Sequence, residues 1–158
     1  MMIISTNKIE TLFVEALSTL DFSLLDPEQG LLGESWFIDV ELVGKLNDQG
    51  MIFDFADVKK QIKQCVDDLV DHKLLVPAQS SAFQHYIEKQ GQLVVEGFYD
   101  GDRYFYHKSP SQAVALIDAE EISPSTVSAY LKQKIWAILP SNVIDLSISL
   151  HNESIEGA

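Results

Sequence analysis

Apolar residues occupy every second position in segment 36–46: they are Trp36, Ile38, Val40 and Leu42. A period of two is typical of a β-strand with one buried face. The turn residues of segment 47–50 follow, and we expect residues 51–53 to return as an antiparallel strand. An earlier strand is predicted over residues 11–17, followed by an irregular stretch that ends in the turn chemistry of residues 26–30.

Two further segments carry apolar residues at helical spacing. The first is predicted to begin at an Asp54 cap and to run to about Val70, with an apolar stripe of Val58, Ile62, Val66 and Leu69. Ser123 followed by Pro124 predicts the start of a second helix, which Pro140 would end. Its expected stripe is Val127, Leu131, Ile135 and Ile138.

The remaining pattern is extended. A terminal strand is predicted in which Ile144, Leu146, Ile148 and Leu150 point to one side. Between the helices, an Asp-Gly turn at residues 100–102 joins two aromatic and β-branched runs, 93–99 and 103–107, which indicates a hairpin. The order of elements predicts one α+β domain over residues 1–158, with an antiparallel sheet, two helices on one face and a hairpin insertion at about 79–119.

The net charge of the chain limits which kinds of partner it can bind. The chain carries 24 acidic and 11 basic residues, for a formal net charge of −13, and Arg103 is its single arginine. Nucleic acid is therefore excluded as a partner, because phosphate binding depends on clustered lysine and arginine. The same charge would repel a polyanionic small molecule. The alternative is that the acidity serves solubility alone.

The sequence also bears on location and redox chemistry. No apolar run approaches the roughly 18 residues of a membrane span. The first residues lack the pattern of a secretory signal, so we expect a cytoplasmic protein with no membrane partner. Cys65 is the only cysteine and cannot form an internal disulfide; its helical setting predicts a buried structural thiol.

Five segments then resemble one family. Residues 35–46 look like its second strand, 50–59 like its Gly-Met-Val-x-Asp-Phe-x-x-Leu-Lys turn, 69–75 like its Leu-Asp-His-x-x-Leu segment, 122–126 like its Asn-Pro-Thr helix start, and 151–154 like its final x-x-Glu-Thr. Together they resemble the 6-pyruvoyl and 6-carboxy tetrahydropterin synthases. The resemblance implies the tunnelling fold (T-fold), a pterin or purine-like small molecule as ligand, and a homo-oligomer built from trimers, with a hexamer as the family's form.

The residues for the family's zinc site are missing. Counting back from Gly44 places residues 32–34, Leu-Gly-Glu, where the family has His-Gly-His, and the first histidine of the chain is His72. We therefore expect no metal site and no cofactor. The family's catalytic cysteine falls at Glu28. Glu28 or Glu34 could act as a carboxylate base, or bind a hard metal with Asp26, or simply be solvated.

Three site residues remain by resemblance. Asp71 and His72 match the family's catalytic pair, in which the carboxylate orients an imidazole that transfers a proton. The alternative is that the pair only caps the end of the first helix. Glu153 matches the glutamate that accepts hydrogen bonds from the heterocycle, so we expect it to bind substrate. His85 and His107 lie in the insertion without metal-like spacing and are expected at the surface.

Three functions are compatible with this pattern. The first is a divergent, zinc-independent family member that binds a pterin or purine-like heterocycle and performs a lyase or proton-transfer step. The second is a catalytically inactive oligomeric scaffold or regulatory protein. The third is an active synthase acting on dihydroneopterin triphosphate, which the missing ligands and the scarcity of basic residues argue against.

Overall fold

The computed structural model describes residues 9–45 and 55–152. Its elements are β1 (Ile9–Asp26), β2 (Gly30–Lys45), α1 (Phe55–Val70), β3 (Leu74–Pro77), β4 (Phe83–Ile87), β5 (Leu93–Tyr99), β6 (Arg103–Ser109), the short 3-10 helix η1 (Ser111–Ala113), β7 (Val114–Ile117), α2 (Pro124–Trp136) and β8 (Val143–Asn152). The expected strand at 51–53, the Asp54 cap and Glu153 lie outside the described residues.

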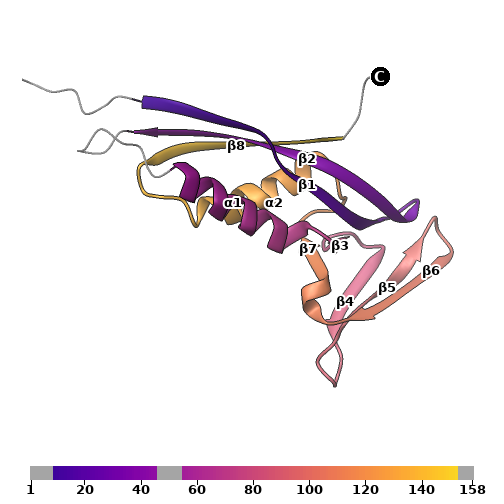
Figure 1. Ribbon diagram of the computed structural model, residues 1–158. Coiled ribbons are helices and arrows are strands. Elements are labelled where there is room, and N and C mark those ends of the chain that lie inside the picture. Colours follow the sequence, from indigo (N-terminus) through magenta and orange to yellow (C-terminus); the bar gives the residue numbers. More distant parts are fainter. Residues whose placement is uncertain (1–8, 46–54, 153–158) are drawn as a thin grey trace, which may run out of the picture.

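The larger of two sheets has the strand order β7-β3-β1-β2-β8. β1, β2 and β8 pair antiparallel, as expected, while β3 pairs in parallel with both β1 and β7. Both helices lie on the same side of this sheet (Figure 1). The α+β class with helices on one face is thus confirmed, and the two short parallel strands extend the predicted antiparallel arrangement.

The helices bury their apolar stripes against the large sheet. α1 contributes Val58, Ile62, Val66 and Val70 to the core, and α2 contributes Val127, Leu131 and Ile135. Ser123 caps α2 through a capping box with Thr126, as the sequence predicts. The prediction that Ile138 continues the stripe was wrong. α2 ends at Trp136, and a tight turn in which the Ile138 N–H donates to the Ile135 carbonyl leaves Ile138 exposed.

β1 is longer than predicted, because the segment expected to be irregular continues the strand to Asp26. Leu20, Phe22 and Leu24 are buried and alternate with Asp21 and Ser23, which is a period-two pattern. A β-bulge between Val14 and Ser18 interrupts the strand and contains Ala16 at φ 49°. Four residues of β1 advance there against two of β2, so the alternation keeps its phase and Val14 and Leu20 face the same core.

The expectation for the start of the last strand was also wrong at one residue. Ile144 is exposed, whereas Val143 is buried together with Leu146 and Leu150. A register shift between Val43 and Gly44 in β2 explains this, because it reverses which side of β8 faces the helices at that end.

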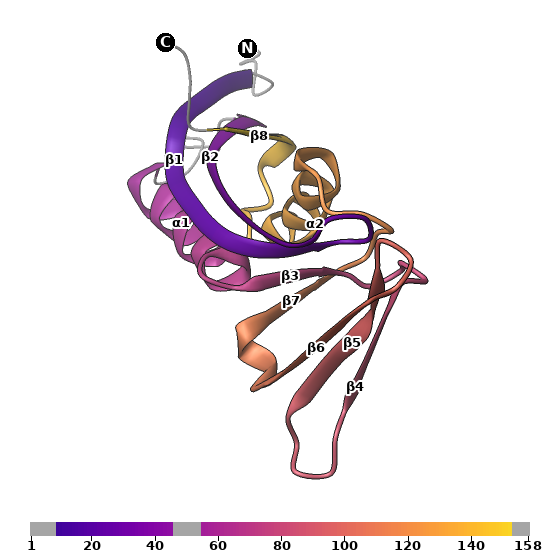
Figure 2. The same cartoon turned by 90° about the vertical axis from the view of Figure 1, so that its right-hand side faces the viewer.

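The smaller sheet, of order β4-β5-β6, packs against the large sheet on the face opposite the helices. Its core residues Phe83, Leu93 and Val95 join Leu25, Leu74, Val76 and Val114 of the large sheet in a second apolar cluster. The predicted hairpin at residues 93–107 is confirmed, with its turn at Asp100 and Gly101. Within the expected insertion at 79–119, β7 instead belongs to the large sheet. Figure 2 shows the smaller sheet projecting beyond β3 and β7.

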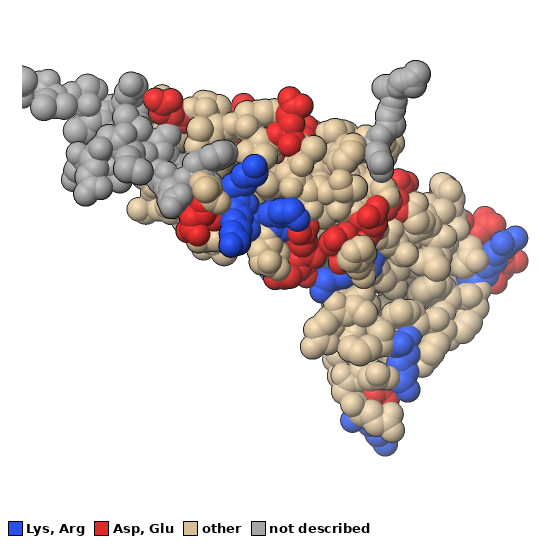
Figure 3. Space-filling model, in the orientation of Figure 1, with Lys and Arg blue, Asp and Glu red and all other residues tan. Residues whose placement is uncertain are grey.

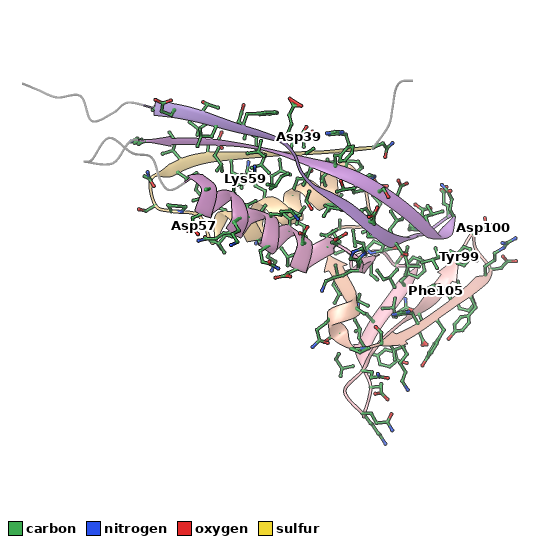
Figure 4. The ribbon with its side chains drawn as sticks, viewed as in Figure 1. Asp39, Asp57, Lys59, Tyr99, Asp100 and Phe105 are labelled. Carbon is green, nitrogen blue, oxygen red and sulfur yellow. The ribbon has the colours of Figure 1, made fainter. Side chains whose placement is uncertain are left out.

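The two sheets also meet where the turn between β1 and β2 lies against the β5–β6 turn, as Figure 4 shows for Tyr99 and Asp100. The Asp100 N–H donates to the Pro27 carbonyl at 3.0 Å. Gly30 has φ 81°, and a Cβ added there would lie 2.6 Å from the Tyr99 ring. Only glycine meets both conditions without strain, so this contact fixes the position of the smaller sheet.

Candidate functional site

A hollow of about 780 Å³ lies between the two sheets, beside the end of α1. Its volume falls in the range of small-molecule sites, roughly 300 to 1,000 Å³. The residues that line it come from β1, β2, the α1–β3 connection, β6 and η1: Asp21, Phe22, Ser23, Gly33, Glu34, Ser35, His72, Lys73, Leu74, His107 and Ala113. The hollow therefore brings together parts of the chain that are far apart in sequence.

The floor of the hollow is a polar patch of the large sheet. Asp21 pairs with Ser35 and Ser23 with Gly33 in the antiparallel register of β1 and β2, so these four residues share the face turned away from the helices. The Ser35 hydroxyl donates to an Asp21 carboxylate oxygen. A Cβ added at Gly33 would meet nothing within 4 Å, which leaves open space above this backbone. A glycine inside a strand is typical of a place where a ligand approaches the backbone closely.

Asp71 and His72 stand at one side of this floor. Asp71 accepts a hydrogen bond from the Asp21 N–H at 2.9 Å with one carboxylate oxygen, and its other oxygen lies 3.3 Å from His72 Nε2. The Asp71 side chain is 18% exposed and that of His72 is 77% exposed. The partly buried carboxylate is thus anchored to β1 and lies beside an imidazole that remains accessible from the hollow, an arrangement suited to a general acid or base.

The backbone at His72 adopts a conformation that non-glycine residues rarely take. Its φ is 63°, and it is the second residue after α1, where glycine is the usual residue. The His72 N–H donates to the Asp21 carbonyl at 2.8 Å, and the Lys73 N–H donates to the Val70 carbonyl at 3.2 Å. This geometry is a common way to end a helix, and a histidine held in this region is also a candidate for function.

The structure corrects the expectation for one of the two histidines of the insertion. His85 on β4 is exposed, as expected. His107 on β6 instead lines the hollow, and its Nε2 is buried with no hydrogen-bond partner in the described part of the chain. The signal was in the sequence, because His107 lies two residues after Phe105, and both therefore share the inward face of β6.

The other carboxylates proposed from sequence do not meet in one place. The Asp26 carboxylate accepts from the backbone N–H groups of Glu28 and Gln29 at 2.9 and 2.8 Å, which fixes the turn between β1 and β2. Asp26 and Glu28 line a separate hollow with Glu120 and Glu121. Glu34 borders the His72 hollow, but its strand partner Phe22 belongs to the apolar core between the large sheet and the helices, called here the helix-side core. The pleat therefore directs the Glu34 side chain toward the helices.

The described residues do not fit the zinc ion of the family named above. The resemblance places its ligands at Leu32 and Glu34, and Leu32 packs against the helix-side core. No group of three histidine, cysteine, aspartate or glutamate side chains within residues 9–45 and 55–152 could hold a metal ion. We therefore derive no step of chemistry through a metal.

Cys65 does not take the place of a catalytic thiol. It lies on α1, partly buried against the helix-side core, away from the lining of the hollow. Burial raises the pKa of its thiol, the nearby Asp68 raises this pKa further, and Lys134 opposes the shift. A raised pKa disfavours the thiolate, which is the nucleophilic form.

The surroundings of the hollow are mixed in charge. Figure 3 shows acidic and basic side chains interspersed over α1, whereas most of the visible surface of β4–β6 is uncharged. Glu153 lies outside the described residues, although β8 ends at Asn152, which pairs with Trp36 next to Ser35 of the floor. None of the described helices is long and apolar enough to span a membrane.

Comparisons with known proteins agree on one family. A family model described as 6-pyruvoyl tetrahydropterin synthase matches residues 23–143. The chain is 25% identical over 118 residues to a Pyrococcus horikoshii protein named "Putative 6-carboxy-5,6,7,8-tetrahydropterin synthase", and 26% identical over 118 residues to a Pyrococcus abyssi protein of the same name. Each match covers 75% of this chain and 66% of the relative, so the chain spans just under two thirds of these relatives' length.

Solved structures show the same fold. A Plasmodium falciparum 6-pyruvoyl tetrahydropterin synthase aligns with a TM-score of 0.70 and 16% identity, covering 92% of this chain and 93% of that one. A Plasmodium vivax 6-pyruvoyltetrahydropterin synthase, in which a catalytic glutamate is replaced by alanine, aligns over the same shares with a TM-score of 0.69 and 16% identity. The fold is therefore that of the α+β, T-fold class. Within this class, the chain belongs to the 6-pyruvoyl tetrahydropterin synthase family.

Proposed function

We propose that this chain binds a pterin or purine-like heterocycle in the hollow between the sheets, and that it does so without zinc. Asp71 and His72 would lie beside the ligand and transfer a proton in a lyase or related step. Glu153 would accept hydrogen bonds from the amino group and ring N–H of the heterocycle. The observation that carries this proposal is the Asp71–His72 pair, in which Asp71 is anchored to β1 and His72 lines the hollow.

The shape of the floor supports a planar ligand. The open space above Gly33 leaves a strip of bare backbone between Ser23 and Ser35, on which a flat ring can lie without a side chain in the way. The ring edge could then exchange hydrogen bonds with Asp21 and Ser35. Family membership and the 6-carboxy-tetrahydropterin synthase names of the Pyrococcus relatives support a pterin as the first compound to test.

The base in a proton transfer has two further candidates. The Plasmodium vivax neighbour carries a glutamate as a catalytic residue, which supports a carboxylate in this role for the present chain. Within one chain Glu34 borders the His72 hollow with its side chain directed to the helix side of the sheet, whereas Glu28 lines the other hollow. Glu28 could therefore act beside His72 only if a second copy of the chain supplied it, or if the turn between β1 and β2 moved.

Calorimetry on the purified, metal-analysed protein tests the proposal. The ligands are pterin, neopterin and guanine, and the control variant is Glu153→Gln, which keeps the size of the side chain but loses the carboxylate. We expect micromolar binding by the native protein without stoichiometric zinc, and its loss in the variant. Absence of binding by both proteins would contradict a ligand site, and one zinc ion per chain would contradict zinc independence.

An inactive scaffold is the second candidate, and the edge of the large sheet favours it. β8 is a ten-residue edge strand, and within the described residues its only sheet neighbour is β2. Unpaired strand edges bind other chains readily. A homo-oligomer built from trimers would cover this edge whether or not the chain is an enzyme. The test is a crystal structure of the protein grown with a ligand in excess. A hollow filled by the chain's own side chains, without bound ligand, would support the scaffold function over ligand binding.

A further inference from the structure

His107 connects the smaller sheet to the hollow. Among the described residues of β4, β5 and β6, it is the only one that lines this space. It pairs with Val95 across β5, and Val95 pairs with His85 on β4, so the three residues form one row on the inward face. Val95 is fully buried and His85 is exposed. The row therefore carries two histidines, of which His85 is exposed and His107 is partly buried and borders the hollow.

The unpaired nitrogen of His107 is unusual for a protein interior. Its Nε2 is shielded from solvent and has no hydrogen-bond partner in the described part of the chain. A buried polar atom without a partner costs free energy, and such atoms in folded proteins call for a reason. His107 as a residue is only partly buried. A turn about its χ2, which is a soft torsion in histidine, would carry the ring nitrogens toward the open side.

The groups around His107 define what it could recognise. His72, Lys73 and His107 line the side of the hollow formed by β6 and the α1–β3 connection, and each can donate a hydrogen bond from nitrogen. The floor carries the Asp21 carboxylate and the Ser35 hydroxyl, and the Asp21 backbone is hydrogen-bonded to His72. Lys73 already donates to the Gln112 carbonyl at 2.5 Å, which fixes it next to η1. This donor-rich side complements the oxygen atoms of a ligand's substituent rather than its ring edge.

We propose that His107 donates a hydrogen bond to an oxygen on the side chain of the bound heterocycle, and that the smaller sheet thereby selects ligands with a hydroxylated or carboxylated substituent. The inference rests on the proposed function, because it assumes that the hollow holds the heterocycle. It adds a specificity residue that the family motifs of this chain do not include. The ring would lie on the Gly33 floor while its substituent points toward β6.

Two probes and three variants test this inference by calorimetry. Neopterin carries a trihydroxypropyl side chain, and pterin is the same ring without it. His107→Leu removes the nitrogens, and His107→Gln returns an amide nitrogen near the position of Nε2. His85→Leu is the matched control from the same row of the sheet. Thermal unfolding of each variant establishes that it is folded before binding is measured.

We expect His107→Leu to weaken neopterin binding about tenfold and to leave pterin binding within twofold of the native protein. His107→Gln should recover part of the loss, and His85→Leu should change neither affinity. If His107→Leu binds both probes as the native protein does, or weakens both equally, the inference is wrong while the proposed function stands. If the native protein binds neither probe, the proposed function fails and this inference fails with it.

Discussion

His72 combines two properties that are hard to reconcile for a purely structural residue. Its backbone lies in the left-handed region at the end of α1, where glycine would be less strained, and its side chain makes no described hydrogen bond to a helix carbonyl. Its imidazole instead lies near the Asp71 carboxylate. We propose that His72 acts as the general acid or base, and the helix cap is the other interpretation left open by the sequence.

Replacing His72 by glycine separates these interpretations. His72→Gly relieves the strained backbone, although glycine also gains freedom in the unfolded chain. We expect the free energy of unfolding in urea to rise by between zero and about 1 kcal/mol, while neopterin binding weakens about fivefold because the imidazole is lost. A variant that is destabilised by more than about 1 kcal/mol would show that the side chain holds the helix end.

Gly33 is the second informative residue. It pairs with Ser23 near the beginning of β2 and has open space where a side chain would be. Valine is a better strand residue than glycine, and its branched side chain would occupy the floor of the hollow. We expect Gly33→Val to be more stable by about 0.5 kcal/mol and to bind neopterin at least tenfold more weakly.

A control for this variant is Thr19→Val, on an exposed position of β1 that does not line the hollow. It should change stability slightly and leave binding unchanged. Gly33→Val protein that is folded and still binds neopterin with native affinity would show that the ligand lies elsewhere.

At the scale of elements, the helix and turn predictions that were correct are those that depend on a local pattern of residues. α2 begins at the Ser123 capping box, and the Asp100-Gly101 turn joins β5 and β6, because each feature depends on a few adjacent residues. The end of β1 was missed, since Leu24 and Leu25 are both buried: they face different apolar clusters on the two sides of the sheet. Two adjacent buried residues hide the period of two that marks a strand.

The candidate site was predictable only in part, for the same physical reason. Asp71 and His72 were found by resemblance, and their anchoring to Asp21 depends on a contact across 50 residues of sequence. His107 lines the hollow because the smaller sheet packs on the face opposite the helices. That packing depends on the long-range contact of Tyr99 with Gly30, which the local sequence does not reveal. Four-residue strands such as β3 and β7 carry too little pattern to reveal such packing.

Packing within the smaller sheet gives a prediction at this scale. A Cβ added at Gly97 would lie 2.0 Å from the Ala82 carbonyl oxygen and 2.8 Å from the Phe83 Cα, both backbone atoms. The strands β4 and β5 would have to separate. We expect Gly97→Ala to lower the free energy of unfolding by about 2 kcal/mol, measured in urea, and Gly33→Ala to change it by less than about 0.5 kcal/mol. Equal stability of the two variants would contradict the close approach of β4 to β5.

At the scale of the whole molecule, the edge of β8 that no described strand covers predicts association. A ten-residue edge strand left unpaired would expose a row of backbone donors and acceptors. We expect light scattering to give a mass three or six times the 17.7 kDa of one chain, unchanged on dilution to low micromolar concentration. A monomer at these concentrations would contradict both the trimer-based assembly and the scaffold function.

Binding of a heterocycle between the two sheets, without a metal ion, underlies the predictions for His72, Gly33 and His107. The most direct test is a crystal structure of the metal-free protein grown with neopterin. We predict electron density for the ring on the Gly33 floor, with His72 and His107 at its substituent and no metal peak beside it. Density at another surface, or a zinc ion coordinated next to the ligand, would contradict the claim.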